Sequence, residues 1–326
     1  MQSAWQPTAS LDSLRLRAEV LRKIRQFFFE RDVLEVETPI VGQSCGTDPH
    51  LDFFTTTYDL ATVDQTLFLQ TSPEFAMKRL LCAGSGSIYQ ICKAFRNGEA
   101  GRYHNPEFTM LEWYQLGYGL DDLMAEVADL LDYLTAGYLN LQATQRLNYQ
   151  DVFFNITGLN PFVFTIEQYE AFALANHQPE ALSLCGHDHN LWLDFIFSHH
   201  VQPTLGQSRF CLVYGYPASQ SSLARINTSN PNTVDRVEVF IEGVELGNGY
   251  YELQDPIEQS LRFDAEINGR NVTGRPAVVK DARLISALEF GLPECAGIAI
   301  GLDRLLMILT HSKHIEDVLS FSITRA

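Results

Sequence analysis

The sequence predicts an α+β fold in which helices flank an antiparallel β-sheet. Apolar side chains recur at helical spacing in residues 11–31 and again in residues 120–138, which indicates two amphipathic helices. Aromatic and β-branched residues dominate segments 88–95, 108–116 and 234–252, which is typical of strands. A polar loop or a tight turn joins these strands in sequence, and such connections favour antiparallel pairing.

The chain is long enough, with 326 residues of which 46% are hydrophobic, to bury one large core or two smaller ones. No Pro-, Ser- or Gly-rich run, low-complexity tract or repeat marks a linker. We therefore expect a single domain over residues 1–326 with an insertion at about residues 143–207. A His-rich stretch in that insertion, residues 185–189, favours a polar loop over a metal site because its spacing matches no zinc pattern.

Charge and composition exclude several classes of partner. The 23 Lys and Arg residues face 40 Asp and Glu residues, and a net charge of −17 repels nucleic acid, so tRNA is disfavoured as a partner. The six cysteines form no CxxC pair and are expected to be buried free thiols. No signal peptide is evident and no apolar run approaches the ~20 residues that span a bilayer, so we expect a cytoplasmic protein.

The N-terminal third begins with the helix over residues 11–31, for which Ser10 is the expected N-cap. A strand is predicted over residues 33–41, and Pro39 places it at the edge of a sheet. Residues 71–74, Thr-Ser-Pro-Glu, then form the N-terminal signature of a second helix. Taken alone, that signature indicates no more than a capped helix.

The loop between strands 88–95 and 108–116 is long and polar, and loops of that length are usually functional or mobile. Arg96 at the strand end can offer a planar fork to a phosphate, and Phe108 on the return strand can stack on a flat ring. The loop therefore suits a polyanion, although a charged hairpin tip in water is the alternative. Its polar residues are Arg96, Glu99, Arg102, His104, Asn105 and Glu107.

The segment 234–252 is predicted to be a hairpin that turns at residues 242–243. That register pairs position 238 with position 247, which makes Glu238 and Glu245 diagonal neighbours on one face. Two carboxylates so placed repel, and a Mg²⁺ ion shared with substrate phosphates would relieve the repulsion. The alternative is a solvated acidic hairpin.

The last motif, residues 297–307, is an apolar, glycine-punctuated strand that turns into a helix. Arg304 lies in the first turn of that helix, where free backbone N–H groups and the helix dipole also attract anions.

Three of these stretches, in this order, resemble motifs of the class II lysyl-tRNA synthetases. Residues 95–112 (Phe-Arg-Asn, then Arg-Tyr-His-Asn-Pro-Glu-Phe-Thr-Met-Leu-Glu) resemble motif 2. Residues 297–307 resemble motif 3, and the helix, strand and Pro39 near the N-terminus resemble motif 1, which forms the homodimer interface in that family. The resemblance covers most of the chain from residue 11 onward and implies a class II catalytic domain.

The resemblance implies two sets of site residues and two small ligands, ATP and Mg²⁺. Arg96 and Arg304 would be catalytic, stabilising the α-phosphate and holding the γ-phosphate. Substrate binding would use Ser72, Pro73, Glu74, Glu112, Tyr114, Asn248, Glu252 and Ala299. ATP binding would use Arg96, Asn97, Gly98, His104, Asn105, Phe108, Glu245, Leu246, Gly301 and Arg304, and the metal ligands would be Glu238 and Glu245.

One position departs from the family pattern. Motif 2 of the family has a glutamate that contacts the adenine amino group, whereas here Gly98 holds that place and Glu99 follows. Either the loop is shifted by one residue or the contact is lost.

Only about ten residues precede the first helix, so we expect no anticodon-binding domain. In outline the chain is similar to the bacterial paralogues that activate (R)-β-lysine, and α-lysine less well, as an adenylate and transfer it to a lysine of elongation factor P. The alternatives are a truncated lysyl-tRNA synthetase that charges tRNA, a non-catalytic regulatory paralogue, and an ammonia-dependent asparagine synthetase. A non-catalytic paralogue should have lost one of the four charged residues of the phosphate and metal sites, and all four are present. An asparagine synthetase does not account for the lysyl-type pocket residues.

Ala299 is predicted to select between α- and β-lysine, because lysyl-tRNA synthetases have glycine at this place. A misplaced methyl group shifts selectivity by ~1–3 kcal/mol. We expect Ala299→Gly to raise kcat/KM for α-lysine relative to (R)-β-lysine, as measured by pyrophosphate exchange. An unchanged ratio would mean that the methyl group merely packs against the sheet.

Overall fold

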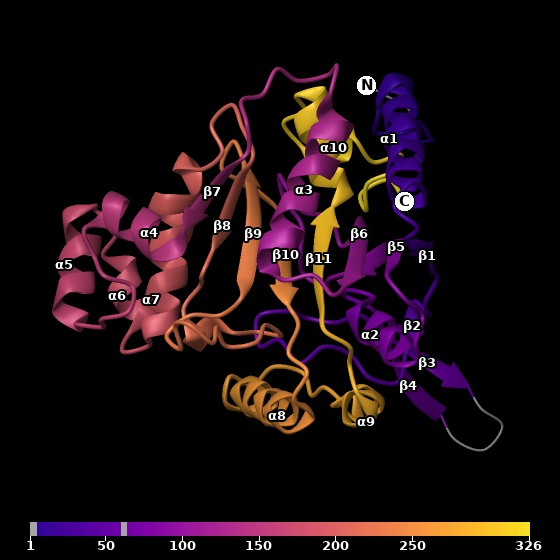
Figure 1. Ribbon diagram of the computed structural model, residues 1–326. Helices are drawn as coiled ribbons and strands as arrows, with labels where there is room; N and C mark the ends of the chain where they lie inside the picture. The colour runs from indigo at the N-terminus through magenta and orange to yellow at the C-terminus, as the bar shows by residue number, and fades with distance from the viewer. Residues whose placement is uncertain (1–4, 60–63) are drawn as a thin grey trace.

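The computed structural model describes residues 5–59 and 64–326 and centres on a mixed, eight-stranded sheet (Figure 1). The strands next to the outer ends, β1–β5 and β7–β8, pair in parallel, and all other neighbours are antiparallel. The predicted α+β fold is thus confirmed. In spatial order the strands are β1 (Leu34–Glu35), β5 (Ile88–Phe95), β6 (Glu107–Leu116), β11 (Cys295–Gly301), β10 (Val244–Tyr251), β9 (Arg236–Ile241), β8 (Cys211–Tyr214) and β7 (Gln145–Asn148).

One face of this sheet is buried in the main hydrophobic core. Alternate residues of the central strands, among them Trp113, Val239 and Ile298, pack there against three helices. Ser10 caps the first of these helices as predicted, because its hydroxyl accepts a hydrogen bond from the Ser13 N–H. The helices are α1 (Leu11–Phe29), α3 (Leu120–Thr135) and α10 (Leu302–Thr310).

The remaining helices outside the insertion lie together at one end of the sheet (Figure 1). They are α2 (Glu74–Cys82), α8 (Pro256–Val272) and α9 (Ala282–Phe290), and they share a smaller core with the ends of β5, β6 and β11. A separate three-stranded sheet lies beside α2 in the order β2 (Val41–Gly42), β4 (Asp64–Leu69), β3 (Thr55–Asp59).

The expected insertion forms a helical lobe with its own core around Tyr149, Phe153 and Trp192, and β7 joins it to the main sheet. Residues 186–188 form a short polar turn between two helices, in line with the predicted polar loop. They end one helix and start the next, because the Asp188 carboxylate accepts hydrogen bonds from two backbone N–H groups and caps the new helix. The helices of the lobe are α4 (Tyr149–Thr157), α5 (Ile166–Ala175), α6 (Glu180–Cys185) and α7 (His189–Ile196).

The predicted strand over residues 33–41 is wrong as a single element. The segment places β1 at the edge of the large sheet and β2 in the small one, with residues 36–40 outside both strands. Pro39 lies in that stretch and has no N–H to donate to a ladder, so the chain leaves one sheet there and joins the other.

The predicted hairpin of β9 and β10 is confirmed, but its register changes within β10. Glu242 and Gly243 both have positive φ, at 50° and 73°, as a two-residue hairpin turn requires. Glu245 pairs with Phe240 as expected, whereas Glu238 pairs with Asn248 rather than with Gly247. The cause is a β-bulge between Glu245 and Gly247, which adds one residue to β10.

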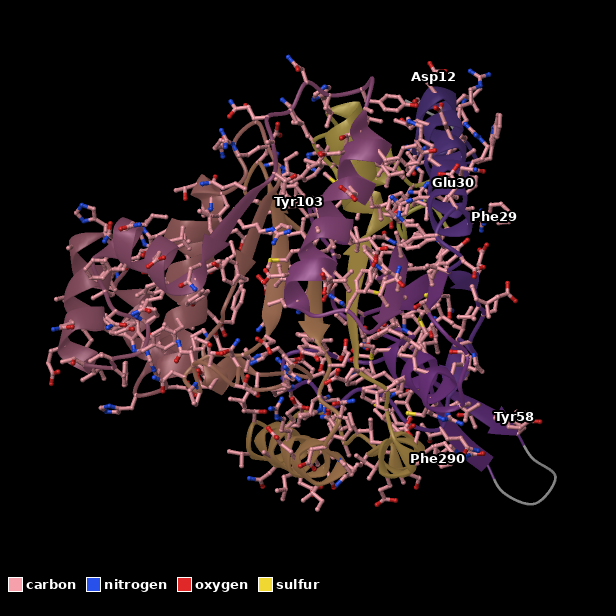
Figure 2. The ribbon with its side chains drawn as sticks, in the orientation of Figure 1. Asp12, Phe29, Glu30, Tyr58, Tyr103 and Phe290 are labelled. Atoms are coloured by element: carbon pink, nitrogen blue, oxygen red, sulfur yellow. The ribbon has the colours of Figure 1, made fainter. Side chains whose placement is uncertain are left out.

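Several surface and composition features can be read from the same structure. Phe29 and Tyr58 point outward on the side of the molecule that carries α1 and β3 (Figure 2), and they are 78% and 53% exposed.

All six cysteines are free thiols, and five are buried, in line with expectation. Within the described residues, no helix combines the length and apolar character needed to cross a membrane.

Two glycines make a matched test of how closely the central strands approach. A Cβ on Gly249 in β10 would lie 2.7 Å from the Cβ of Ile298 and 2.8 Å from the carbonyl oxygen of Gly297, so Gly249→Ala should destabilise the fold by ~1–3 kcal/mol. Gly269 in α8 has open space around it, so Gly269→Ala should stabilise by ~0.5–1 kcal/mol. Urea unfolding midpoints measure both effects. Equal midpoints for the two variants would contradict the crowding between β10 and β11.

Candidate active site

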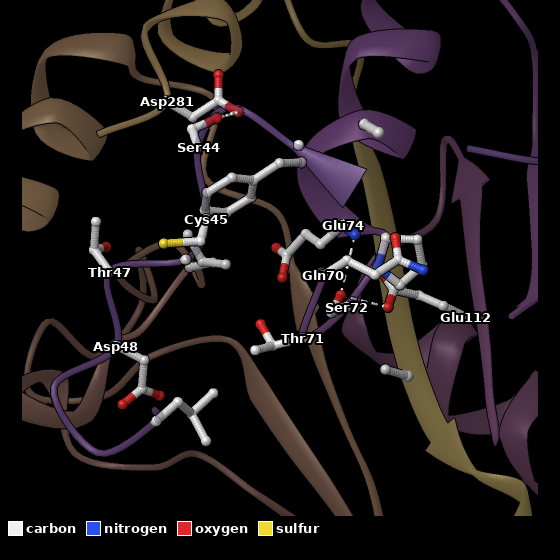
Figure 3. Close-up of a pocket in the computed structure, with 18 of the residues that line it drawn as sticks. Ser44, Cys45, Thr47, Asp48, Gln70, Thr71, Ser72, Glu74, Glu112 and Asp281 are labelled. Atoms are coloured by element: carbon white, nitrogen blue, oxygen red, sulfur yellow. Dashed lines mark hydrogen bonds between the residues drawn. The ribbon is translucent and has the colours of Figure 1, made fainter. Parts of the chain in front are cut away.

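A cavity of about 490 Å³ opens on the face of the sheet opposite the main core (Figure 3). Its inner wall is made by β6, β10 and β11, and its rim by the start of α2, the segment 41–51 and parts of α8 and α9. All eight predicted substrate-binding residues line it: Ser72, Pro73, Glu74, Glu112, Tyr114, Asn248, Glu252 and Ala299.

Glu112 is the centre of a buried hydrogen-bond network in this cavity. The Tyr114 hydroxyl donates to Glu112 Oε1 at 2.7 Å, and the Ser72 hydroxyl donates to Oε2 at 2.8 Å. Ser72 in turn accepts from the Glu74 N–H, so the network is tied to the first turn of α2 (Figure 3). Burial, and then the nearby charge of Glu74, raises the pKa of Glu112 to about 8.

Glu74 and Glu252 lie on either side of a buried cation that the sequence analysis did not identify. Lys78 Nζ is 2.6 Å from Glu74 Oε1 and 2.6 Å from Glu252 Oε2. Burial raises the pKa of Glu252 to about 8, against the opposing charge of Lys78. The four-residue spacing of Glu74 and Lys78 on a helix was the available signal, but such pairs are common on exposed helices.

A second, smaller cavity of about 100 Å³ adjoins the first. Eight of the ten predicted ATP-binding residues line it: Arg96, His104, Asn105, Phe108, Glu245, Leu246, Gly301 and Arg304. The other two, Asn97 and Gly98, are exposed and line neither of these cavities.

Arg304 is held in a fixed orientation at the start of α10. Its guanidinium donates to the carbonyl oxygens of Glu245 at 2.8 Å and Tyr103 at 3.3 Å, and to His104 Nε2 at 2.7 Å. Burial and the Arg304 charge lower the pKa of His104, which favours the neutral imidazole that can accept this bond. A guanidinium preorganised in this way can bind a phosphate without first reorganising.

Arg96 faces the same cavity from the end of β5. Its guanidinium carbon lies 5.0 Å from the centroid of the Phe108 ring, and one terminal nitrogen is 3.8 Å from Glu99. Arg96 Nε is buried and finds no hydrogen-bond partner among the residues the structure describes. A buried N–H without a partner is costly, so this donor is poised for a ligand acceptor.

The departure from the family pattern at Gly98 has a backbone cause. Gly98 has φ of +80°, a conformation that L-residues rarely adopt, and Glu99 rather than residue 98 lines the smaller cavity. Glu99 also lies 3.9 Å from His104 Nε2. Glu99 is therefore the acidic side chain that this part of the loop brings to the cavity.

The β-bulge in β10 decides which acidic and amide groups share the cavity face. Without it, strict alternation would put Asn248 on the opposite face from Glu245. With it, Asn248 pairs with Glu238 and lines the same cavity as Glu245. Arg236 Nε donates to Asn248 Oδ1 at 3.2 Å and fixes the amide.

The two predicted metal ligands, Glu238 and Glu245, lie close enough to repel each other. Burial raises the pKa of Glu238 to about 6; the charge of Arg236 opposes this rise, and the charge of Glu245 adds to it. Arg236 and the Tyr216 hydroxyl already bind Glu238. Within residues 5–59 and 64–326, no group of three or more acidic, His or Cys side chains forms a metal site. Two carboxylates do fit the donor set of Mg²⁺ at nucleotide sites, where substrate phosphates supply further oxygens.

Arg96, Asn248 and Ala299 line both cavities. The acidic cavity suits an amino acid with two amines, and the arginine-lined cavity suits a polyphosphate. The shared residues mark the place where a carboxylate and an α-phosphate would meet. Two such cavities on one face of a mixed, largely antiparallel sheet suit a class II domain, which activates an amino acid with ATP.

Comparison with known proteins agrees with that class. The family model for class II tRNA synthetases (D, K and N) matches residues 5–325. Curated relatives named elongation factor P–(R)-β-lysine ligase include those of Vibrio cholerae, 45% identical over 99% of both chains, and Pseudoalteromonas translucida, 44% identical over 99% of this chain and 98% of the relative. Another, from Vibrio parahaemolyticus, is 46% identical over 98% of each.

The chain belongs to the class II tRNA synthetase family and, within it, to the elongation factor P–(R)-β-lysine ligases. Membership of the class II family implies ATP as a substrate.

Glu112 should make stability depend on pH. Its pKa rises from 4.5 to about 8 on folding, so its stabilising effect is complete below pH 4.5 and is lost as the pH rises through 8. Glu112→Gln keeps a similar shape but cannot ionise. We expect the variant to gain stability relative to the parent between pH 5 and 9, by more than ~1 kcal/mol. Urea unfolding at a series of pH values measures this, and parallel curves would contradict the raised pKa.

Proposed function

We propose that this protein uses ATP to activate (R)-β-lysine, and α-lysine less well, and transfers the product to a lysine side chain of elongation factor P. The observation that carries the proposal is the sharing of Arg96 and Asn248 by the acidic and the arginine-lined cavities. The names of the relatives, which match over nearly the whole chain, supply the acceptor. Since the acceptor is a translation factor, we expect the reaction in the cytoplasm.

In the first step, an oxygen of the substrate carboxylate attacks the α-phosphorus of ATP, and pyrophosphate leaves with the bonding electrons. Asn248 holds the carboxylate, while Arg96 stabilises the charge that develops on the α-phosphate. Arg304 and His104 hold the β- and γ-phosphates. When bound by Glu238 and Glu245, Mg²⁺ supplies positive charge that neutralises the phosphate oxygens.

The two amines of the substrate are recognised by carboxylates. Glu74 binds the amine nearer the carboxylate, and Glu252 with Tyr114 binds the terminal ammonium, with Glu112 beside them. Binding of a cation favours the ionised form of Glu252 and Glu112, whose pKa values are raised by burial in the free protein.

The nucleotide base would lie on Phe108, in the part of the smaller cavity near Asn105. The Asn105 side chain donates to the Glu107 carbonyl at 2.6 Å and accepts from the Ile323 N–H, which fixes this wall. Glu99, brought into the cavity by the turn at Gly98, is the residue that would contact the adenine amino group.

In the second step, the neutral ε-amine of the acceptor lysine attacks the carbonyl carbon of the adenylate. An amide bond forms, AMP leaves with the electrons of the acyl–phosphate bond, and the amine loses a proton. We also propose a homodimer across the side that exposes Phe29 and Leu34, because both residues lie in the segment that resembles motif 1, which forms the homodimer interface in the class II family.

The decisive experiment supplies the protein with ATP, Mg²⁺, (R)-β-lysine and either elongation factor P or tRNA. We expect pyrophosphate exchange that depends on (R)-β-lysine, and modification of elongation factor P that is detected by mass spectrometry. Charging of tRNA should be poor even at low salt, where phosphate contacts are strongest. Arg304→Ala should lower exchange by ~100-fold or more. Arg15→Ala, on an exposed pair in α1, is the matched control that should retain activity. Efficient charging of tRNA would overturn the choice of acceptor.

A further inference from the structure

Lys78 is a buried cation that touches the proposed amino-acid site from behind. It lies one helical turn beyond Glu74 in α2, whereas Glu252 follows β10, far away in the sequence. The side chains of Lys78 and Glu252 are 2% and 1% exposed, and that of Glu74 is 15% exposed. Glu74 and Glu252 line the large cavity, but Lys78 does not.

Lys78 engages one oxygen of each carboxylate. Glu252 Oε1, which is not the oxygen paired with Lys78, is buried and has no hydrogen-bond partner among the described residues. It lies on the cavity side, since a Cβ on Gly297, a cavity-lining residue, would come within 3.0 Å of it. A buried carboxylate oxygen without a partner is poised for a cationic ligand.

When both are ionised, two carboxylates this close would repel each other without the ammonium between them. Their charges outweigh the effect of burial and raise the pKa of Lys78, so the cation is present throughout the working pH range. Removal of one partner from such a buried group leaves an uncompensated charge, which the protein relieves by movement or by protonation.

We infer that Lys78 is a positioning residue that fixes the separation of Glu74 and Glu252, and thereby the spacing of the two amines in the diamino acid that the cavity accepts. This inference rests on the proposed function, in which those two carboxylates read the two amines of the substrate. A rigid pair of anions at a fixed distance favours a ligand whose two ammonium groups match that distance.

Other titratable groups also surround Lys78 and enter the pH behaviour. They come from several elements: Glu74 and Cys82 of α2, Glu112 and Tyr114 of β6, Glu252 after β10, and Cys295 of β11. The two thiols are buried with raised pKa values and stay neutral, so the carboxyl groups dominate the response.

The test compares Lys78→Met, which removes the charge but keeps the length, with Lys78→Arg, which keeps the charge but has a larger, planar head. Lys93→Met is the matched control, because it removes a lysine charge from an exposed pair with Glu107. Pyrophosphate exchange is measured for each protein with (R)-β-lysine and with α-lysine, whose two amines are one carbon further apart, from pH 6 to 9. Parent exchange with (R)-β-lysine tests the proposed function by itself.

For Lys78→Met we expect KM for (R)-β-lysine to rise by at least ~10-fold at pH 7, with KM for ATP unchanged and the pH midpoint of KM shifted upward. The shift is upward because loss of a nearby cation raises the pKa of Glu252 further, and binding needs its ionised form. A residue that served only the fold would change stability and would leave that midpoint in place.

If Lys78→Met does not fold, Lys78→Arg decides the matter. We expect the Arg variant to change the ratio of kcat/KM for (R)-β-lysine to that for α-lysine by more than ~5-fold, and Lys93→Met to leave it unchanged. An active parent whose Lys78 variants keep the parental ratio and pH midpoint would overturn this inference and leave the proposed function intact. An inactive parent would instead contradict the proposed function.

Discussion

Burial of one face of the central sheet fixes the register of every strand that carries the site. The pleat places Leu111 and Trp113 in the main core and, by the same alternation, Glu112 and Tyr114 in the cavity. A one-residue slip of β6 would bury a carboxylate in an apolar core and expose an indole. The acidic site is therefore held in place by hydrophobic burial on the opposite face of the same strands.

The cavity face carries more negative charge than a protein interior normally tolerates, and two buried cations compensate for it. Lys78 lies between Glu74 and Glu252, and Arg236 binds Glu238 while it also orients Asn248. Lys78 is almost fully enclosed by the fold and Arg236 is 17% exposed. Both are permanent parts of the site, whereas the second set of positive charges would arrive with the substrate.

Sequence motifs named most of the candidate residues that line the two cavities, because these residues are concentrated in short stretches. The strands on either side of the motif 2 loop, the hairpin turn at Glu242 and Gly243, and the helix that starts at Leu302 all follow from local pattern and turn chemistry. The substrate-binding residues named from those motifs all line one cavity. The family assignment by motif agrees with the whole-chain comparisons.

By itself, the sequence determined the α+β class, the positions of the central strands along the chain and the identity of the charged groups, because periodicity and side-chain chemistry are local properties. Only the tertiary structure decided the bulge that turns Asn248 toward Glu245, the break of the segment near Pro39 between two sheets, and the contact of Lys78 with Glu252. Each of these depends on pairing between residues that are distant in the chain. Such pairing is set by packing of the whole fold, and no local pattern encodes it.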